Sequence, residues 1–152
     1  VPNSQKLDSD RFKFRVQWNK QLMLYISEFQ KEEKNIILCG DMNVAHFDID
    51  ISNPKTKKNK VAGFFDIERA NFQHLIESLN LVDVFRNLNP TKQRSTYWSN
   101  FMKGIRKSSN GWGIDYFLIS KELFESDKNI NQTIEHEILG SDHCPIILNI
   151  NV

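Results

Sequence analysis

The sequence predicts an α/β fold built in layers, and two patterns indicate it. Apolar residues recur at helical spacing over residues 12–31 and 66–80, as expected for helices that bury one face. Short runs rich in β-forming residues separate and follow these helices, at residues 36–39, 114–120, 133–138 and 146–150. Strands interleaved with helices are typical of layered α/β architectures. The 152 residues are enough for one domain with a real core.

The composition is that of a globular domain and excludes several other classes. Apolar residues make up 39% of the chain, with 11 phenylalanines, so the chain is not disordered. No apolar run approaches the roughly 18 residues of a membrane span, and the chain opens on polar sequence without a signal peptide. Two cysteines, Cys39 and Cys144, argue against a disulfide framework. We expect an intracellular protein without a membrane partner, in the nucleus of a eukaryote or the cytoplasm of a prokaryote.

The net charge of +1 gives no overall basic signature. Attraction to a nucleic acid would therefore depend on local clusters of positive charge. Two such clusters are Lys55, Lys57, Lys58 and Lys60, and Lys103, Arg106 and Lys107. Both can equally be solvated loops, which is what most lysine runs are.

The first helix is expected over residues 12–31, after a loop of about ten residues. Its apolar face is predicted from Phe14, Trp18, Leu22, Tyr25, Ile26 and Phe29. The run 36–39 is wholly apolar and stops at Gly40, which is typical of a strand buried on both faces. Residues 41–63 are polar and contain Asn53-Pro54, so we expect a long loop.

The second helix is expected to start at Asp66, an N-cap, with Glu68 in its first turn and an end near Asn80. The apolar run 81–85 is ambiguous between strand and helix. It precedes a turn at Asn89-Pro90.

The last third of the chain is rich in β-forming residues. Residues 95–101 are aromatic and β-prone, and 103–111 read as a hairpin connection. In the strand at 114–120, Ile114, Tyr116 and Leu118 should share one face. A short helix at 121–125 and strands at 133–138 and 146–150 complete the set.

Three polar clusters lie where apolar strands end or begin. They are Gly40-Asp41-Met42-Asn43, Gly111-Trp112-Gly113-Ile114-Asp115 and Gly140-Ser141-Asp142-His143. Strand ends are where ligand sites form in layered α/β folds. Phosphodiester hydrolysis needs an activated water, stabilised phosphate charge and a stabilised leaving group. The inventory that meets these needs is Asp41, Asn43, Asp115, Asp142 and His143.

Each cluster also has a structural interpretation. Asp41 and Asn43 can form an Asx-turn after the strand. Asp142-His143 can be an N-cap beside a surface imidazole. Asp115 is harder to explain in this way, because aspartate is disfavoured in strands and costly when buried unpaired, although a salt bridge would satisfy it.

The motifs resemble those of the exodeoxyribonuclease III and abasic-site endonuclease family. The resemblance rests on three stretches in matching order, Gly40 to His46, Gly111 to Leu118 and Gly140 to Ile146. Shorter matches between them, such as Ala62-Gly63-Phe64 and Tyr97-Trp98-Ser99, extend it over essentially the whole chain.

The resemblance implies a role for each motif position. Asp41 matches the residue that activates or orients water, and Asn43 the amide that places water and phosphate. His143 matches the imidazole on the scissile phosphate, and Asp115 its carboxylate partner. The residues implied to bind a divalent metal are Asp142, Asp41, Asn43 and His143. Mg²⁺ is the implied cofactor, with Mn²⁺ as the alternative. Substrate contacts are expected from Asn59 and from the aromatic residues Tyr97 and Trp112, which would line the pocket for the extrahelical abasic sugar.

Three features depart from the family pattern. Val1-Pro2-Asn3 matches a tripeptide midway through the family's domain, directly after an active-site tyrosine. The resemblance therefore implies that residues 1–152 are the C-terminal half of a four-layer α/β sandwich, with the N-terminal half absent. Gly113 stands where the family usually has an arginine. The loop 53–63 is one residue longer than usual, and Asn59 is its remaining candidate for a phosphate contact.

The function implied for the complete protein is DNA repair by hydrolysis of duplex DNA 5′ to an abasic site, with 3′–5′ exonuclease or 3′-phosphodiesterase activity. The alternatives are a retrotransposon-type endonuclease, another phosphodiesterase on the same fold, or a truncated non-catalytic homologue. A DNA repair function is favoured over these alternatives by the close match to the family at Asn43-Val44-Ala45-His46 and around Trp112. We expect the sheet face left open to be covered by the N-terminal half or by a second chain. We also expect the isolated chain to be inactive, because Asp142 alone is a poor Mg²⁺ site.

Overall fold

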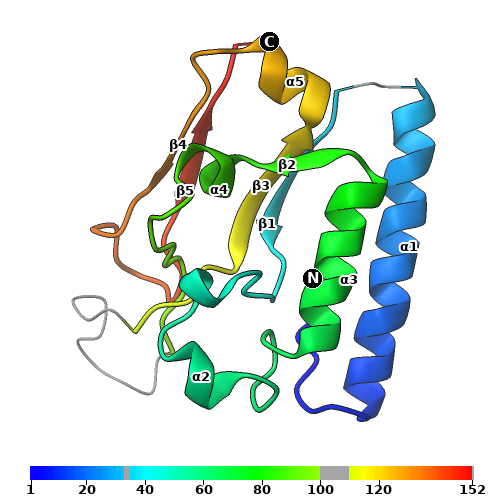
Figure 1. The fold of residues 1–152 in the computed structure, drawn as a ribbon, viewed down its shortest axis with the longest axis vertical. Coiled ribbons are helices and arrows are strands. Elements are labelled where there is room, and N and C mark those ends of the chain that lie inside the picture. Colours follow the sequence, from blue (N-terminus) through cyan, green and yellow to red (C-terminus); the bar gives the residue numbers. More distant parts are fainter. Residues whose placement is uncertain (33–34, 100–109, 152) are drawn as a thin grey trace.

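The computed structural model describes residues 1–32, 35–99 and 110–151 (Figure 1). The basic cluster predicted at Lys103, Arg106 and Lys107 lies outside these residues, as does most of the connection expected at 103–111.

The α/β layering predicted from the sequence is confirmed. Helices α1 (Asp10–Glu32) and α3 (Asp66–Ser78) lie side by side next to a three-stranded sheet (Figure 1). Its strands are β1 (Ile37–Asp41), β3 (Asp115–Ser120) and β2 (Leu81–Asp83), in the order β1-β3-β2. Both pairings are antiparallel.

Shorter elements complete the chain. A 3-10 turn, η1 (Asp48–Asp50), and the one-turn helix α2 (Pro54–Lys57) lie in the stretch predicted to be a long loop. The ambiguous run after α3 becomes β2 followed by α4 (Val84–Leu88). After β3 come α5 (Lys121–Ser126) and an antiparallel pair, β4 (Asn131–Ile134) and β5 (Ile146–Asn149).

The core lies between the two long helices and the sheet. Leu118 and Tyr116 of β3, both fully buried, meet Phe72 and Leu75 of α3 and Ile26 of α1. The shared face predicted for Tyr116 and Leu118 is therefore confirmed. Ile114, predicted on the same face, precedes β3 and packs in a separate cluster with Ile51 and Phe64. The described residues contain no helix long and apolar enough to cross a membrane.

Two predictions about the helices were wrong in detail. On α1, Phe14, Tyr25 and Phe29 are exposed rather than buried, because α3 and the sheet cover only the stripe that includes Phe12 and Ile26. At α3, the N-cap is Phe65 rather than Asp66.

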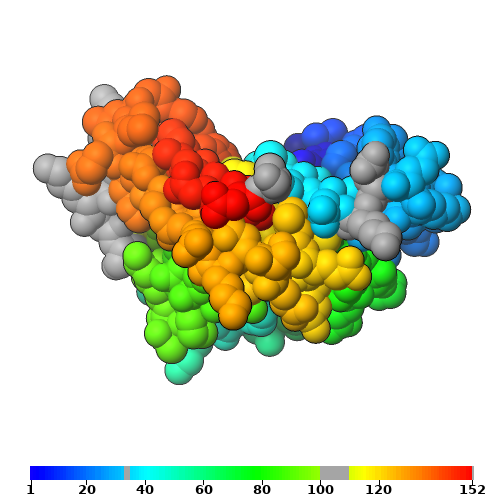
Figure 2. Space-filling view, turned by 90° about the horizontal axis from the view of Figure 1, so that it is seen from above, coloured from blue at the N-terminus to red at the C-terminus, as the bar shows by residue number. Residues whose placement is uncertain are grey.

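The prediction that β1 is buried on both faces was also wrong. Leu38 packs against the helical core, but Ile37 is 44% exposed and Cys39 is exposed. These two side chains point away from Leu38, because successive residues of a strand face opposite sides. Figure 2 shows a hollow between the C-terminal strands (orange to red) and α1 (blue), with β1 (cyan) between them. The sheet thus has one face covered by helices and one that is open at β1.

Candidate active site

Antiparallel pairing of β1 with β3 brings the first two polar clusters together. The register places Asp41, the last residue of β1, directly opposite Asp115, the first residue of β3. Directly opposed residues in an antiparallel pair point to the same side of the sheet. A backbone hydrogen bond from Met42 N to Ile114 O (2.9 Å) continues the pairing beyond the strands. Two carboxylates separated by 74 positions in the sequence, from 41 to 115, therefore become neighbours at one end of the sheet.

The third cluster reaches the same end through the segment that contains Tyr97. Tyr97 forms isolated β-bridges with both Trp112 and His143. The backbone N–H of Cys144 donates to Thr96 O at 2.8 Å, and that of Trp98 donates to Asp142 O at 2.8 Å. Of the residues predicted to be β-prone, 95–101, those up to 99 are described. They form a short connecting segment that joins the residues before β3 to those before β5.

His143 is held by Asp115, as the sequence predicts. The imidazole Nδ1 lies 2.9 Å from Asp115 Oδ2, and the same oxygen accepts a hydrogen bond from Thr96 Oγ1 at 2.6 Å. This hydrogen bond to Asp115 raises the pKa of His143 above its ordinary value, against the opposing effect of partial burial. Nδ1 is thus engaged by Asp115, and the ring contributes to the lining of the pocket described below.

Asp41 and Asn43 form a tightly bonded pair at the end of β1. Asp41 Oδ1 accepts the backbone N–H of Asn43 at 2.7 Å, and Oδ2 accepts the Asn43 side-chain amide at 2.8 Å. Asn43 has a φ of 48°, in the left-handed region that asparagine tolerates better than most residues. Burial raises the pKa of Asp41, partly offset by the backbone hydrogen bond from Asn43. The Asx-turn interpretation is thus geometrically correct, but the turn also presents its carboxylate to the site.

These residues surround one cavity of about 320 Å³. It is lined by Asn3, Asp41, Asn43, Ala62, Gly63, Tyr97, Ser99, Trp112, Ile114 and His143. Four catalytic or metal-binding candidates and both aromatic substrate candidates thus either line it or contact its lining. Of the five polar residues expected to converge, the structure brings together Asp41, Asn43, Asp115 and His143, whereas Asp142 is not part of the lining.

Two other candidates, Asp142 and Asn59, are not part of this lining. Asp142 is half-buried, and its Oδ1 accepts a hydrogen bond from Ser141 Oγ at 3.3 Å. Both polar atoms of the Asn59 side chain are engaged by Asp66, with Nδ2 to Oδ2 at 2.8 Å and the Asp66 backbone N–H to Oδ1 at 2.7 Å. Asn59 thus caps the start of α3 in this structure, and its role in substrate binding stays a prediction.

The altered loop places a lysine against Trp112, one of the residues that line the pocket. Lys57 Nζ lies 5.1 Å from the centroid of the Trp112 ring and donates to Ser52 Oγ at 2.7 Å. A cation over an indole face is a favourable electrostatic contact. One member of the basic cluster predicted at residues 55–60 is therefore engaged at the site rather than free in solvent.

Sequence reasoning missed two residues that support the site. Arg15 of α1 is 2% exposed and donates to the carbonyl oxygens of Met42 (2.8 Å) and Asn43 (3.3 Å). Thr96 bonds Asp115, as described above. A signal for Arg15 was present, because it occupies the same helical face as Phe12 and Ile26, and a charged residue on an apolar face needs a partner.

The donor set was tested for its fit to a divalent cation. Mg²⁺ prefers octahedral oxygen coordination. In the part of the chain that the structure describes, no group of three Asp, Glu, His or Cys side chains is placed to hold an ion, and this includes Asp41, Asp142 and His143. Both carboxylate oxygens of Asp41 are already bonded to Asn43. The described residues alone therefore do not fit a complete Mg²⁺ site.

Fold and site together define a layered α/β domain with a polar pocket, in which an imidazole held by a carboxylate lies near a second carboxylate and an amide. The sequence model of the Endonuclease/Exonuclease/phosphatase family matches residues 7–143. The chain belongs to this family.

Its relatives confirm the resemblance to the exodeoxyribonuclease and abasic-site endonuclease group. The chain is 41% identical to an exodeoxyribonuclease of Bacillus subtilis over 152 residues, which are 100% of this chain and 58% of that protein. It is 41% identical to a DNA-(apurinic or apyrimidinic site) endonuclease of Dictyostelium discoideum over 148 residues, 96% of this chain and 40% of the relative.

Solved structures agree with these matches. A 3′-5′ exonuclease from Neisseria meningitidis has a TM-score of 0.90 and 26% identity, over 100% of this chain and 59% of that one. An AP endonuclease from Archaeoglobus fulgidus has a TM-score of 0.85 and 30% identity, over 100% and 59%. A 3′ phosphatase from Neisseria, bound to a product DNA hairpin, has a TM-score of 0.90 and 26% identity, over 99% and 58%. The chain thus spans about half the length of the proteins it matches.

Proposed function

We propose that the protein to which this chain contributes is a DNA repair nuclease, which hydrolyses the backbone of duplex DNA 5′ to abasic sites and also processes 3′ ends. The observation that supports this most directly is the His143–Asp115 contact of 2.9 Å, opposite Asp41 at the mouth of one pocket. The relatives named as exodeoxyribonuclease and AP endonuclease support the choice of DNA. The relative named as a 3′ phosphatase supports the processing of 3′ ends.

In this proposal His143 binds the scissile phosphate. Asp115 accepts the Nδ1 proton and fixes the ring, and Nε2 is the atom proposed to donate to a phosphate oxygen. Because its pKa is raised, a larger share of His143 is cationic near neutral pH than of an exposed histidine. A cation placed where phosphate charge develops stabilises the transition state.

Asp41 is the group that orients and deprotonates the attacking water. Burial raises its pKa, and a carboxylate with a raised pKa is a better proton acceptor than a fully solvated one. Asn43 fixes the carboxylate through two hydrogen bonds of 2.7 and 2.8 Å. The abasic sugar would rest against Tyr97 and Trp112, which line the same pocket.

The cofactor proposal is a divalent cation, Mg²⁺ with Mn²⁺ as the alternative. Asp142 is the carboxylate of this chain proposed to contribute to its binding. The remaining ligands would come from protein outside this chain or from substrate phosphate, since the described residues do not form a complete site. Several kcal/mol of transition-state stabilisation, on the order of 10³ or more in rate, would then depend on those other ligands.

The open face of the sheet indicates a protein partner. The face of β1 that bears Ile37 and Cys39 is open, and a sheet with an apolar inner face normally packs against another layer. We propose that this face is covered by the N-terminal part that the relatives possess and this chain does not match, or by a second chain. Residues 1–152 would then be the C-terminal half of one four-layer domain.

A mixing experiment tests the proposal. The chain is assayed alone, and mixed with the unmatched N-terminal part of the Bacillus subtilis relative, on a duplex with a tetrahydrofuran abasic analogue and on a 3′-phosphate end. We expect no incision by the chain alone. Incision should follow mixing in Mg²⁺ and stop on addition of EDTA.

Asp41→Asn in the active mixture should reduce the rate by a factor of about 10² or more. Asp48→Asn is the matched control, because Asp48 is an exposed carboxylate paired with Arg69. Robust Mg²⁺-dependent incision by the chain alone would show that its catalytic residues have been misassigned. A folded mixture that cleaves neither substrate would reject the proposed function.

A further inference from the structure

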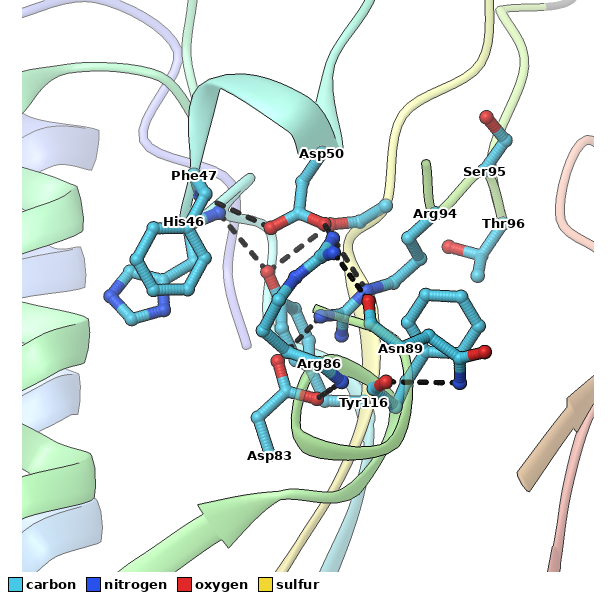
Figure 3. A network of polar contacts seen from close by, with 12 residues as sticks. His46, Phe47, Asp50, Asp83, Arg86, Asn89, Arg94, Ser95, Thr96 and Tyr116 are labelled. Atoms are coloured by element: carbon cyan, nitrogen blue, oxygen red, sulfur yellow. Dashed lines mark hydrogen bonds and ion pairs between the residues drawn. The ribbon is translucent and has the colours of Figure 1, made fainter. Parts of the chain in front are cut away.

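A buried network of charges joins η1, β2, α4 and the segment that carries Arg94 (Figure 3). Arg94 and Asp50 are fully buried, and Asp83 is 8% exposed. Arg94 Nη2 donates to Asp83 Oδ2 at 2.5 Å, and Arg94 Nε lies 3.4 Å from Asp50 Oδ1. Arg86 also pairs with Asp50. Two carboxylates and two guanidinium groups therefore balance each other away from water, which is the condition under which buried charge is tolerated.

Arg94 is also enclosed by aromatic rings. Its guanidinium carbon lies 4.2 Å from the centroid of the Tyr116 ring and 5.2 Å from that of Phe85. The Tyr116 hydroxyl, in turn, lies 2.6 Å from Val44 O and 3.1 Å from Gly113 O. Arg94 thus packs on the residue that ties the loop after Asn43 to the segment before Asp115.

Gly113 explains why Arg94 can lie there. A Cβ at position 113 would be 2.6 Å from Arg94 Cγ, 2.7 Å from its Cβ and 2.8 Å from its Cδ. The Gly113 N–H donates to Asp50 O at 2.7 Å, so this backbone has little freedom to move away. Glycine is required here by space, because the Arg94 side chain occupies the volume into which a side chain at 113 would project. This is the position at which the family pattern expects an arginine.

We propose that Arg94 is a positioning residue, whose buried side chain fills the volume beside Gly113 and so aligns the three segments of the active site. These segments carry Asn43, Thr96 and Asp115. The connection to the reacting groups is short. Thr96, two residues after Arg94, donates to Asp115 Oδ2 at 2.6 Å, and that oxygen holds His143 at 2.9 Å. A shift of residue 94 relative to residue 113 moves Thr96 relative to Asp115.

An exchange of the two side chains tests this inference. The variants are Arg94→Gly, Gly113→Arg and the double exchange Arg94→Gly/Gly113→Arg. Each is followed by urea unfolding and by NMR titration of the His143 imidazole. Arg94→Gly should lower the unfolding midpoint and lower the pKa of His143. Gly113→Arg alone should also lower the midpoint, because two arginines compete for one space. The double exchange should regain at least half of the midpoint lost in Arg94→Gly and return the His143 pKa toward the wild-type value.

The control separates positioning from stability alone. Leu123→Ala removes a buried side chain from the cluster around Ile119 and Ile130, away from the pocket. It should lower the midpoint without moving the pKa of His143. If Arg94→Gly does not fold, Arg94→Lys replaces it. Lysine keeps the positive charge but lacks the planar guanidinium that pairs with two carboxylates and stacks on the Tyr116 ring. The lysine variant should still lower the His143 pKa.

Two results would overturn the inference. One is a double exchange no more stable than the weaker single variant. The other is an unchanged His143 titration in every folded variant at position 94. The inference depends on the proposed function only for the role of the Asp115–His143 pair. Neither readout requires nuclease activity, so a failure of the proposed function is seen separately in the mixing assay.

Discussion

At the scale of single residues, the chemistry of the site depends on how each polar atom is engaged. Asp115 Oδ2 is shared by Thr96 and His143, so the imidazole is held in a defined orientation through Nδ1. Asp41 uses both of its oxygens on Asn43, so its carboxylate is fixed in orientation. A phosphate bound between them would meet groups that are already ordered, and such preorganisation is the main source of electrostatic catalysis.

Asp115→Asn tests the contact that orients His143. The change removes the negative charge and the strong acceptor that raise the pKa of His143, so we expect this pKa to fall. A folded-state pKa raised above the unfolded value of about 6.5 contributes stability that is full below that value. The contribution is lost as pH rises through the raised pKa.

The wild-type advantage over Asp115→Asn should therefore shrink as pH rises from about 6 through the raised pKa of His143. NMR titration of the imidazole and urea unfolding at several pH values measure the two effects. A His143 pKa that is the same in both proteins would contradict the hydrogen bond as the cause of the shift.

Tyr116→Phe tests the buried hydroxyl that joins two site segments. The hydroxyl lies within hydrogen-bond distance of Val44 O and Gly113 O and accepts the backbone N–H of His46. Its removal leaves buried backbone groups without partners, and we expect a loss of about 1–3 kcal/mol in the free energy of unfolding. Tyr25→Phe is the control, because Tyr25 is 63% exposed. Equal stability of the two variants would show that the hydroxyl bonds are replaced by water.

At the scale of elements, the site is assembled by one strand pair and supported by one helix. The β1–β3 register brings Asp41 opposite Asp115. A slip of the register by one residue would point one of these carboxylates to the opposite face. Helix α1 reaches over the end of β1 and holds the following turn through Arg15. The long helix is thus part of the scaffold of the turn that carries Asn43, as well as of the core.

Arg15→Met tests this link between α1 and the turn. Methionine keeps most of the side-chain volume but cannot donate to the Met42 and Asn43 carbonyl oxygens. We expect a loss of about 1.5–3 kcal/mol in the free energy of unfolding, the range for hydrogen bonds to a charged group. Lys13→Met on the same helix should change stability by less than about 0.5 kcal/mol, because Lys13 is exposed and pairs with an exposed Asp10. A loss no larger for Arg15→Met than for Lys13→Met would contradict the support assigned to α1.

At the scale of the whole molecule, the chain has a helix-covered face and an open one. The hollow in Figure 2 lies between α1 and the C-terminal strands, with β1 between them. The Ile37 and Cys39 side chains of β1 are exposed. Large exposed apolar patches mark interaction surfaces or lead to aggregation. Because the chain spans about half the length of its relatives, the segment that it does not match is the proposed cover for this face.

Association in solution tests the open face. We expect the isolated chain to form dimers or larger species by light scattering, and to become a defined complex when the unmatched N-terminal part of the Bacillus subtilis relative is added. Ile37→Lys should weaken both kinds of association, because it places a charge on the open face. Lys20→Glu, an exposed change on α1, should weaken neither. A monodisperse monomer that does not bind the added part would reject the proposed partner.

The two long helices, the alternation of β3 and the three polar clusters could be predicted from local sequence patterns. Local periodicity was enough for α1, α3 and the alternation of β3, because the spacing of apolar residues reflects which side of an element is buried. The three polar clusters at strand ends were visible in the same way. The contact between His143 and Asp115 followed from the chemistry that an imidazole on a phosphate requires, together with the resemblance to a family.

The distant residues that support those clusters could be identified from the tertiary fold alone. The partners through which Arg15, Arg94 and Thr96 support the clusters lie 11 to 44 positions away in the sequence, and no local pattern encodes such a pairing. The exposure of Phe14 and Ile37 was likewise invisible, because an apolar side chain looks the same in sequence whether its cover lies within the chain or outside it. Burial is a property of the neighbours that an element finds, and those neighbours are set by strand register and helix packing rather than by the element's own residues.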